Sequence, residues 1–214
     1  MNDCRSVFIT RHGGPDVLEL RSTSISDPKE DEVLVEIKYS GINFADIMSR
    51  MGLYTTRLKP PYRLGMEIAG VVSKSGSEKN RSLVGRAVVG FCRSGGYSSH
   101  VNVPAEQLFV IDDKWLNVAA AIPVNYLTAY FMMIHQGSLR KDETILIHGI
   151  GGGVGIAALQ IANKIGAKII GTASAGKHSK IRDLGVEHLI DYQSEDFSER
   201  VMEMTHGKGV DLVM

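Results

Sequence analysis

The stretch ILIHGIGGGVGIAALQIA, residues 145–162, carries the clearest structural signal in this sequence. It opens as an apolar strand and closes as an amphipathic helix. Between the two, glycine occupies five of the seven positions 149–155. Glycine weakens backbone order, so a strand, a glycine-rich turn and a helix in succession predict a loop built to hold a ligand. The alternative is a tight turn that holds none.

Beyond this loop, short apolar strands alternate with helices. The pattern predicts parallel strands joined by right-handed crossovers, which is a doubly wound α/β sheet. We assign it to a domain over residues 123–214 and expect that domain to be truncated, because four of about six strands are present. The predicted strands are 143–149, 167–173, 187–191 and 210–214, and the predicted helices lie at 154–166, within 176–185 and at 194–206.

The first part of the chain, residues 1–122, reads as a separate β-rich domain. Its segments alternate apolar and polar residues, as half-buried strands do. Where the two domains meet along the chain, the apolar run 118–134 contains Pro123 and is too short to span a membrane, so we interpret it as a buried helix. The predicted strands are 5–11, 17–23, 31–39, 66–73, 84–91 and 97–103, with a short helix at 43–51.

The composition excludes several classes of protein. With 43% hydrophobic and 22% charged residues, the 214-residue chain can form a globular core. Lys plus Arg and Asp plus Glu both number 24, so no net charge attracts nucleic acid or anionic lipid. Cys4 and Cys92 are too few for a disulfide framework, and the first residues lack the apolar core of a signal peptide. We expect a cytoplasmic protein with no integral membrane segment.

The glycine spacing favours a dinucleotide over an empty turn. Gly149, Gly152 and Gly155 form G-x-x-G-x-x-G between a strand and a helix, the setting that a dinucleotide fingerprint requires. The unpaired N–H groups and positive dipole end of a helix attract a pyrophosphate, and glycines let it approach the backbone. We therefore predict cofactor contacts from these three residues and from Gly153 and Val154.

The next strand predicts which dinucleotide binds. A site for NADH needs Asp or Glu about 20 residues beyond the loop, to accept from the ribose 2′-hydroxyl. This chain has Ser174 and then Lys177 in that region. Lys177 can pair with a 2′-phosphate and nothing repels one, so NADPH is the predicted cofactor, with Ser174 as a further phosphate contact. The alternative is that Lys177 is a solvated lysine at a helix start.

Several stretches together resemble the medium-chain dehydrogenase/reductase superfamily, and within it the zinc-free quinone oxidoreductase branch. Two shorter runs, VNYLTAY and RSGGYSSHV, favour the sub-branch of the vesicle amine transport protein homologues, and polyketide enoyl reductases have similar patterns. The resemblance implies a GroES-like first domain, a Rossmann second domain, family members longer than this chain, and a homodimer of the full-length protein. The stretches are SGINFADIMSRMGLY (40–54), LGMEIAGVV (64–72), PVNYLTAY (123–130), HGIGGGVGIAALQIA (148–162) and LIDY (189–192).

The residues argue against both zinc sites of the related alcohol dehydrogenases. Those enzymes place a cysteine where this chain has Asn43 and a histidine where it has Met66. An amide and a thioether cannot replace a thiolate and an imidazole at a catalytic zinc, and the four cysteines of a structural zinc site do not exist here. We therefore predict no metal, and we expect Glu67 to be structural.

The resemblance implies that Asn43 lies beside the nicotinamide and the substrate and that Tyr54 lines the substrate pocket. Asn43 can also be the N-cap of its helix, with Asp46 closing a reciprocal capping pair. Tyr54 can instead be a buried aromatic that covers the sheet. Asn43, Tyr54 and Asp46 are the catalytic candidates, and Asn43 is also a cofactor candidate.

Three further residues are cofactor candidates by resemblance. Thr128 sits in an apolar helix, where its hydroxyl needs a partner, and the resemblance makes that partner the nicotinamide end; the alternative is a bond to its own helix. Asn125 is its companion. Tyr192 resembles the phosphate-contacting tyrosine of the family, and the alternative is a surface tyrosine.

The predicted reaction follows from the loss of zinc. An alkoxide is hard to stabilise without a Lewis acid, whereas a reduced quinone or conjugated enone is a delocalised anion that hydrogen-bond donors can hold. We therefore predict an NADPH-dependent oxidoreductase of a small-molecule quinone or enone. Two alternatives are an NADPH-binding interaction or lipid-handling protein with little turnover, and an enoyl-thioester reductase.

Overall fold

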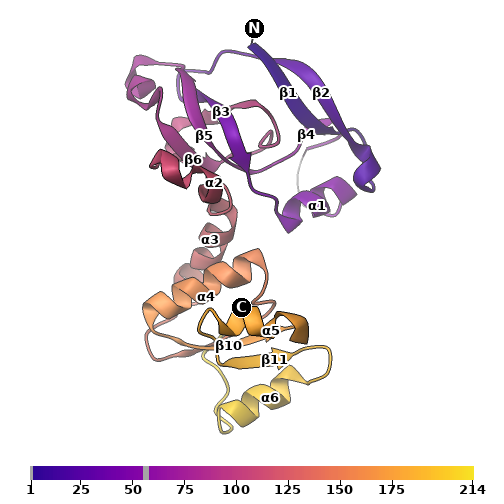
Figure 1. Ribbon diagram of the computed structural model, residues 1–214, viewed down its shortest axis with the longest axis vertical. Helices are drawn as coiled ribbons and strands as arrows, with labels where there is room; N and C mark the ends of the chain where they lie inside the picture. The colour runs from indigo at the N-terminus through magenta and orange to yellow at the C-terminus, as the bar shows by residue number, and fades with distance from the viewer. Residues whose placement is uncertain (1, 55–57) are drawn as a thin grey trace. The chain divides into compact units, whose positions relative to one another are not determined.

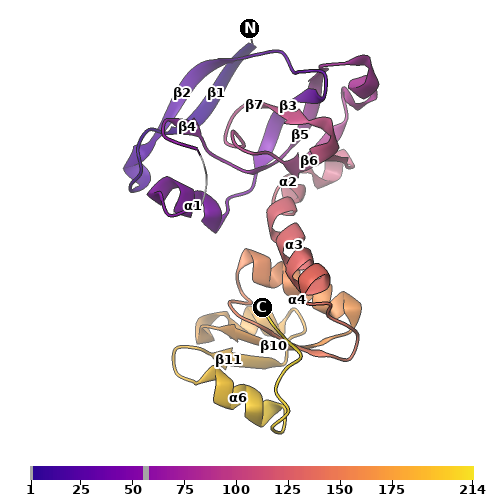
Figure 2. The same ribbon diagram turned by 180° about the vertical axis from the view of Figure 1, so that it is seen from behind.

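The computed structural model describes residues 2–54 and 58–214 of the chain. It divides into two compact units, Met1–Val124 and Asn125–Met214. Each unit has its own sheet structure, as Figures 1 and 2 show from opposite sides. Each unit also has its own buried core. The domain boundary expected after residue 122 stays a prediction.

The first unit contains two antiparallel sheets. Its strands are β1 (Asn2–Ile9), β2 (Leu18–Ile25), β3 (Glu32–Ser40), β4 (Tyr62–Arg63), β5 (Glu67–Ser75), β6 (Ala87–Phe91), β7 (His100–Pro104) and β8 (Leu108–Val110). The larger sheet has the order β7-β3-β5-β6-β8 and the smaller one β2-β1-β4. Alternate residues of β3, β5, β6 and β7 face one core, in which Val33, Val35, Ile68 and Val88 are buried. The β-rich first domain is therefore confirmed.

Two strands of this unit were not predicted, and the strands predicted at 84–91 and 97–103 begin later, at Ala87 and His100. The short strands β4 and β8 carry too few residues to show an alternating pattern. The strand predicted at 84–91 begins only at Ala87, because Val84 follows a 3₁₀ turn and Gly85 has a φ of 81°, outside the range of strands.

The second unit is a parallel sheet flanked by helices. Its strands are β9 (Thr144–Ile147), β10 (Lys168–Ala173), β11 (His188–Asp191) and β12 (Leu212–Val213), and its later helices are α4 (Gly153–Ile165), α5 (His178–Arg182) and α6 (Phe197–Met204). The sheet order is β11-β10-β9-β12 and all pairs are parallel. This is the start of the 3-2-1-4-5-6 order of a doubly wound domain, so the predicted fold class is confirmed.

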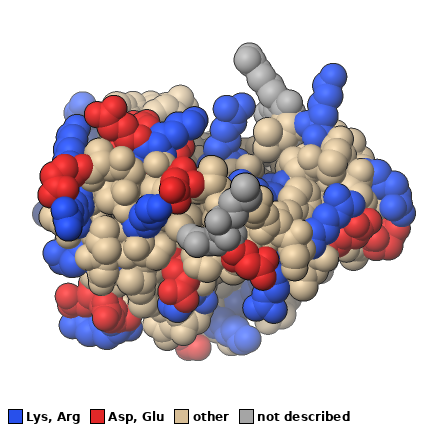
Figure 3. Space-filling view, turned by 90° about the horizontal axis from the view of Figure 1, so that it is seen from above, with Lys and Arg blue, Asp and Glu red and all other residues tan. Residues whose placement is uncertain are grey.

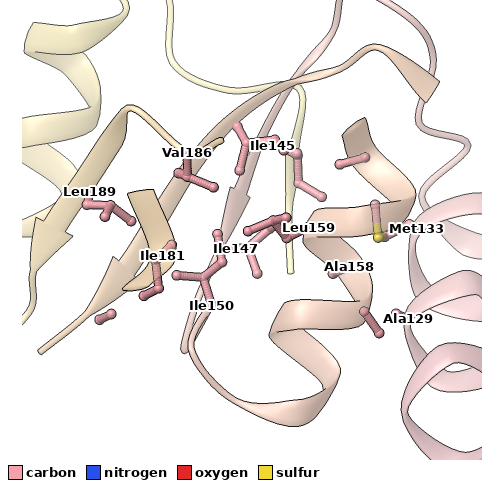
Figure 4. Close-up of a cluster of buried hydrophobic side chains, with 14 of the residues drawn as sticks. Ala129, Met133, Ile145, Ile147, Ile150, Ala158, Leu159, Ile181, Val186 and Leu189 are labelled. Carbon is pink, nitrogen blue, oxygen red and sulfur yellow. The ribbon is translucent and has the colours of Figure 1, made fainter. Parts of the chain in front are cut away.

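The core of this unit lies mainly between the sheet and α4. Ile147, Ile150 and Leu159 pack at its centre, with Ile181 of α5 beside them (Figure 4). A separate cluster joins Val201 of α6 to residues of three strands. Successive strand residues point to opposite faces, so α4 and α6 cover opposite faces of the sheet (Figure 1).

The apolar run 118–134 is not the single buried helix that was predicted. It is divided among α2 (Leu116–Ala119), α3 (Pro123–Tyr130) and a π-helical segment, Phe131–Gln136. The break falls before Pro123, which lacks an N–H donor and therefore begins a helix rather than continuing one. Leu127, Tyr130 and Phe131 are 56%, 51% and 51% exposed, so one face of the run is not buried.

Within the described residues, no single helix has the length and apolar character to cross a membrane. One pair of helical segments, Asp113–Ala119 and Pro123–Gln136, meets both criteria when taken together, with a 71° bend between its parts.

On the face drawn in Figure 3, acidic and basic side chains are interspersed.

Both cysteines are free and buried. Burial raises the pKa of the Cys92 thiol to about 12. Burial opposes ionisation of Cys4 too, but hydrogen bonds with the Ser6 side chain and the His100 backbone outweigh it and lower the pKa of Cys4.

Candidate functional site

The glycine loop connects β9 to α4 at the carboxyl end of the parallel sheet, where ligands bind in doubly wound domains. Gly149 has a φ of 61°, a left-handed conformation that glycine adopts at no steric cost. Gly152 is the N-cap of α4, as the predicted helix start near Gly153 requires. Gly149, Gly152 and Gly153 are all exposed, so a ligand can reach their backbone.

The third glycine of the motif has a different task. Gly155 is buried, and a Cβ atom on it would lie 2.5 Å from the Gly149 carbonyl oxygen and 2.6 Å from the Ile150 Cα. Only a glycine lets the first turn of α4 pack this closely on the loop. The N–H groups of Gly153, Val154 and Gly155 belong to the first turn of the helix, where no intrahelical acceptor exists. The loop therefore has the shape and the donors of an anion cradle.

Lys177 lies beside this cradle. A Cβ atom on Gly151 would be 3.0 Å from Cδ of Lys177, so the lysine stem packs against the loop. Ser174 directly follows β10, and its carbonyl accepts from the Lys177 N–H at 2.9 Å. The structure thus brings Lys177 to the loop and connects Ser174 to Lys177, and Lys177 forms no ion pair with any described residue.

The three remaining cofactor candidates, Asn125, Thr128 and Tyr192, lie in different surroundings. A Cβ atom on Gly153 would lie 2.6 Å from Oδ1 of Asn125, so this amide is at the start of α4. The premise for Thr128 is wrong: its side chain is exposed, because α3 is apolar without being enclosed on that face, and its hydroxyl needs no protein partner. Tyr192 is 57% exposed, and its position near Lys177 stays a prediction.

In the first unit, buried polar groups meet at the start of α1 (Phe44–Met51). Asn43 is the N-cap, and its N–H donates to Oδ2 of Asp46 at 2.9 Å, the Asp46 half of the predicted capping pair. The Asn43 side-chain amide donates to Oε1 of Glu67 at 2.7 Å. Tyr97 donates to the same Asp46 oxygen at 2.8 Å. Asn43 therefore links two buried carboxyl groups, Asp46 at 2% and Glu67 at 0% exposure.

The burial of these groups shifts their ionisation. Burial raises the pKa of Asp46, and hydrogen bonds from Asn43 and Tyr97 offset this only in part. Burial also raises the pKa of Glu67, and the nearby charge of Asp46 adds to the effect. Burial and the same charge raise the pKa of Tyr97 well above its usual range, so Tyr97 stays a donor. Tyr97 was not singled out from the sequence, although it lies in the quoted run RSGGYSSHV.

A pocket of about 190 Å³ adjoins this cluster. Asp46 and Tyr54, two of the catalytic candidates, both line it, together with Met66. Tyr54 is 44% exposed, so it is not the buried aromatic of the alternative interpretation. Arg63 and Arg93 supply positive charge at the same pocket.

The donor set at this position does not fit zinc. The Asn43 amide is committed to Glu67, and Met66 offers only a thioether. Zinc sites use thiolate, imidazole and carboxylate ligands. No group of three or more His, Cys, Asp or Glu side chains within residues 2–54 and 58–214 could hold a metal ion.

Replacing Asp46 with Asn is expected to change the pH dependence of stability. Between its ordinary pKa and its raised pKa, the folded chain holds a proton on Asp46 that the unfolded chain has released. The free energy of unfolding of the wild type therefore falls as pH rises through this window, and Asp46→Asn lacks that part of the decline. Urea unfolding of both proteins between about pH 4 and pH 8 measures the difference.

The matched control is Asp27→Asn. The Lys74 ammonium lowers the pKa of this exposed carboxyl, so the wild type should lose stability relative to this variant as pH falls, the opposite trend. Parallel stability curves for the wild type and Asp46→Asn would show that the assigned ionisation of Asp46 is wrong.

Comparisons with known proteins place these two units in one family. Residues 29–113 match the model of the alcohol dehydrogenase GroES-like domain, and residues 153–214 match that of the zinc-binding dehydrogenase. The crystal structure of CurK enoyl reductase is 30% identical, with a TM-score of 0.90 over 99% of this chain and 67% of that one. The chain belongs to the medium-chain dehydrogenase/reductase superfamily.

Other similar members of this superfamily include vesicle proteins and quinone reductases. The synaptic vesicle membrane protein VAT-1 homolog of Danio rerio is 39% identical over 213 residues, which are 98% of this chain and 44% of that relative. Escherichia coli quinone oxidoreductase, solved in complex with NADPH, is 38% identical, with a TM-score of 0.90 over 96% of this chain and 64% of that one. The chain thus spans about half to two thirds of these superfamily members, as the resemblance predicted.

Proposed function

We propose that this member of the superfamily is an NADPH-dependent reductase that transfers hydride to a quinone or a conjugated enone without zinc. The observation that carries the proposal is the exposed glycine cradle at the start of α4, with the Lys177 stem packed against it and no acidic residue from Ser174 to Lys177. An acid there would favour NADH, and a lysine favours a 2′-phosphate.

The cradle fits the dinucleotide by its backbone. The N–H groups of Gly153, Val154 and Gly155 are the proposed pyrophosphate donors, and the exposed Gly149 and Gly152 leave room for the ligand. Ser174 and Lys177 are the proposed contacts of the 2′-phosphate. Asn125 is a further proposed contact, because its amide lies against Gly153 of the cradle. Thr128 and Tyr192 remain candidates of lower geometric support, because the contacts described for them do not connect them to the cradle.

The chemistry assigned to the first unit is stabilisation of negative charge. Bound NADPH supplies the hydride. The reduced acceptor carries negative charge on oxygen, and Tyr54, which is 44% exposed and lines the pocket, is the proposed hydroxyl donor to it. Asn43 is the proposed contact of nicotinamide and acceptor, and its bond to Glu67 fixes its orientation. Asp46 acts by positioning Asn43 and Tyr97.

The similarity to CurK enoyl reductase favours a second candidate, reduction of an enoyl thioester. The electronic demand is the same, because hydride addition to an enoyl thioester also gives a delocalised enolate. The similarity to the VAT-1 homolog favours a third candidate function, an NADPH-binding protein with little turnover, which the experiment below also tests.

The deciding experiment follows NADPH absorbance at fixed protein with no acceptor, an ortho-quinone, a para-quinone, an enone or crotonyl-CoA. We expect consumption of NADPH that requires a quinone or the enone and that increases with protein concentration. Consumption with crotonyl-CoA alone would favour the enoyl-thioester reductase. Tight NADPH binding, measured by calorimetry, with no acceptor-dependent consumption would reject the reductase and favour the binding protein. The homodimer expected of the full-length protein is checked by light scattering of that longer protein in the same buffer.

A further inference from the structure

We propose that Thr172 is a positioning residue for the dinucleotide site. Its side chain and backbone contact three consecutive residues of the glycine loop, and we infer that they set the conformation in which the loop meets a pyrophosphate. This inference rests on the proposed dinucleotide function and names the residue that shapes its cradle.

Three contacts connect Thr172 to the loop. The Gly149 N–H donates to Oγ1 of Thr172 at 3.2 Å. The Ile150 N–H donates to the Thr172 carbonyl at 3.1 Å. Nδ1 of His148 lies 3.2 Å from the same hydroxyl oxygen. One residue of β10 therefore contacts the three successive residues that follow the end of β9.

The position of Thr172 in the sheet explains why it can do this. The pairing of β9 with β10 ends at Ile147 and Gly171, and Thr172 is the next residue of β10. At that point the chain leaves β9 and turns into the loop. The Thr172 side chain, 3% exposed, reaches across the gap that the departing strand leaves.

The hydroxyl is fully used in this arrangement. A threonine hydroxyl has one proton to donate and lone pairs to accept with. It accepts from Gly149 and, when it donates to Nδ1 of His148, both of its hydrogen-bonding roles are filled. The His148 ring also contacts Phe197 of α6 edge-on, with 4.8 Å between ring centroids. The loop is thereby connected to a helix on the opposite face of the sheet.

A second anchor fixes the loop from the apolar side. Ile150 is fully buried, and a Cβ atom on Gly171 would lie 2.6 Å from its Cδ1 atom. Figure 4 shows the Ile150 side chain in the core near Ile147 and Ile181. The buried Ile150 side chain anchors the loop in the core. The Thr172 hydroxyl instead accepts from the peptide N–H of Gly149, the residue with the left-handed conformation. The orientation of that peptide determines where the following N–H groups point.

This arrangement connects the two proposed phosphate subsites. Thr172 contacts the pyrophosphate loop, and two residues later the same strand leads to Ser174 and then Lys177. A loop that is already held in its binding conformation loses less entropy when the ligand binds. Removal of the hydroxyl should therefore weaken every dinucleotide equally, because both NADPH and NADH carry the pyrophosphate.

The test compares Thr172→Val, which keeps the branched shape and removes the hydroxyl, with Thr172→Ser, which keeps the hydroxyl. Calorimetric titration should give dissociation constants for NADPH and NADH that both rise about tenfold in Thr172→Val and stay within about threefold of wild type in Thr172→Ser. Unchanged binding by Thr172→Val would overturn the proposal. So would a loss confined to NADPH, because that would assign Thr172 to the 2′-phosphate subsite.

A second measurement needs no nucleotide and separates this inference from the proposed function. Amide hydrogen exchange of the ligand-free chain, followed by NMR, should accelerate at Gly149 in Thr172→Val and stay slow at Ile150, whose acceptor is a backbone oxygen. Equal exchange at Gly149 in wild type and variant would overturn the proposal. If the wild type binds neither dinucleotide, the proposed function fails, and exchange at Gly149 still decides whether Thr172 shapes the loop.

Discussion

Replacing Lys177 with Glu is expected to weaken NADPH binding by about 100-fold or more and to leave NADH within about threefold of the wild type. The substitution removes a charge-assisted partner of the 2′-phosphate and puts a negative charge beside it. NADH has no such phosphate, and the new carboxylate can accept from its ribose hydroxyl. Calorimetric titration of both dinucleotides against both proteins measures the two ratios.

The matched control is Lys208→Glu, which makes the same change of charge in the same unit. Lys208 is exposed and precedes β12, so it lies near the amino ends of the parallel strands, whereas the glycine loop lies at their carboxyl ends. Lys208→Glu should leave the affinities for NADPH and NADH near the wild-type values. Equal losses for NADPH and NADH in Lys177→Glu would show that the 2′-phosphate assignment is wrong and that Lys177 serves the pyrophosphate or the fold.

Replacing Gly155 with Ala should destabilise the second unit by about 3 kcal/mol, at the upper end of ordinary overpacking. Helix propensity alone predicts the opposite sign, a gain of about 1 kcal/mol for alanine inside α4. Packing outweighs propensity here because the added methyl would meet backbone atoms of Gly149 and Ile150 at 2.5 and 2.6 Å, and backbone cannot rotate away. Urea unfolding monitored by circular dichroism gives the change in free energy.

Gly176→Ala is the control for this substitution. A Cβ atom on Gly176 would have no heavy atom within 4 Å, and its φ is not positive, so stability should change by less than about 1 kcal/mol. A Gly155→Ala protein as stable as the wild type would mean that α4 and the loop can separate without cost. The close approach would then not be what the third glycine of the motif provides.

The sequence predicted the second unit better than the first. Strand, loop and helix around Gly149 have strong and different periodicities, and each helix forces the next strand to lie parallel. The two-residue strand β4 has no periodicity to detect and depends on its pairing with β1. The run containing Leu127 and Phe131 was misread for a related reason: hydrophobic composition indicates a helix but not which side of it meets a neighbour.

The candidate site also contains residues that the sequence identified and residues that it missed. Backbone features such as the cradle glycines and the N-cap Asn43 follow local rules, so the sequence alone identified them. Thr172 and Tyr97 were missed because each acts on residues distant in sequence: Thr172 on Gly149, 23 positions earlier, and Tyr97 on Asp46, 51 positions earlier. A lone threonine in the apolar strand IIGTA was the available signal for the first of them.

The burial of the two thiols has a consequence for the chemistry that we propose. Quinones and enones are electrophiles, and a thiolate that meets one can add to it and form a covalent thioether adduct. Cys92 is 2% exposed with a pKa raised to about 12, so it is both enclosed and protonated. Cys4 ionises more easily but is 0% exposed, so enclosure alone protects it. A chain that handles such acceptors therefore keeps its own nucleophilic sulfur out of their reach while it is folded, and becomes vulnerable to them when it unfolds.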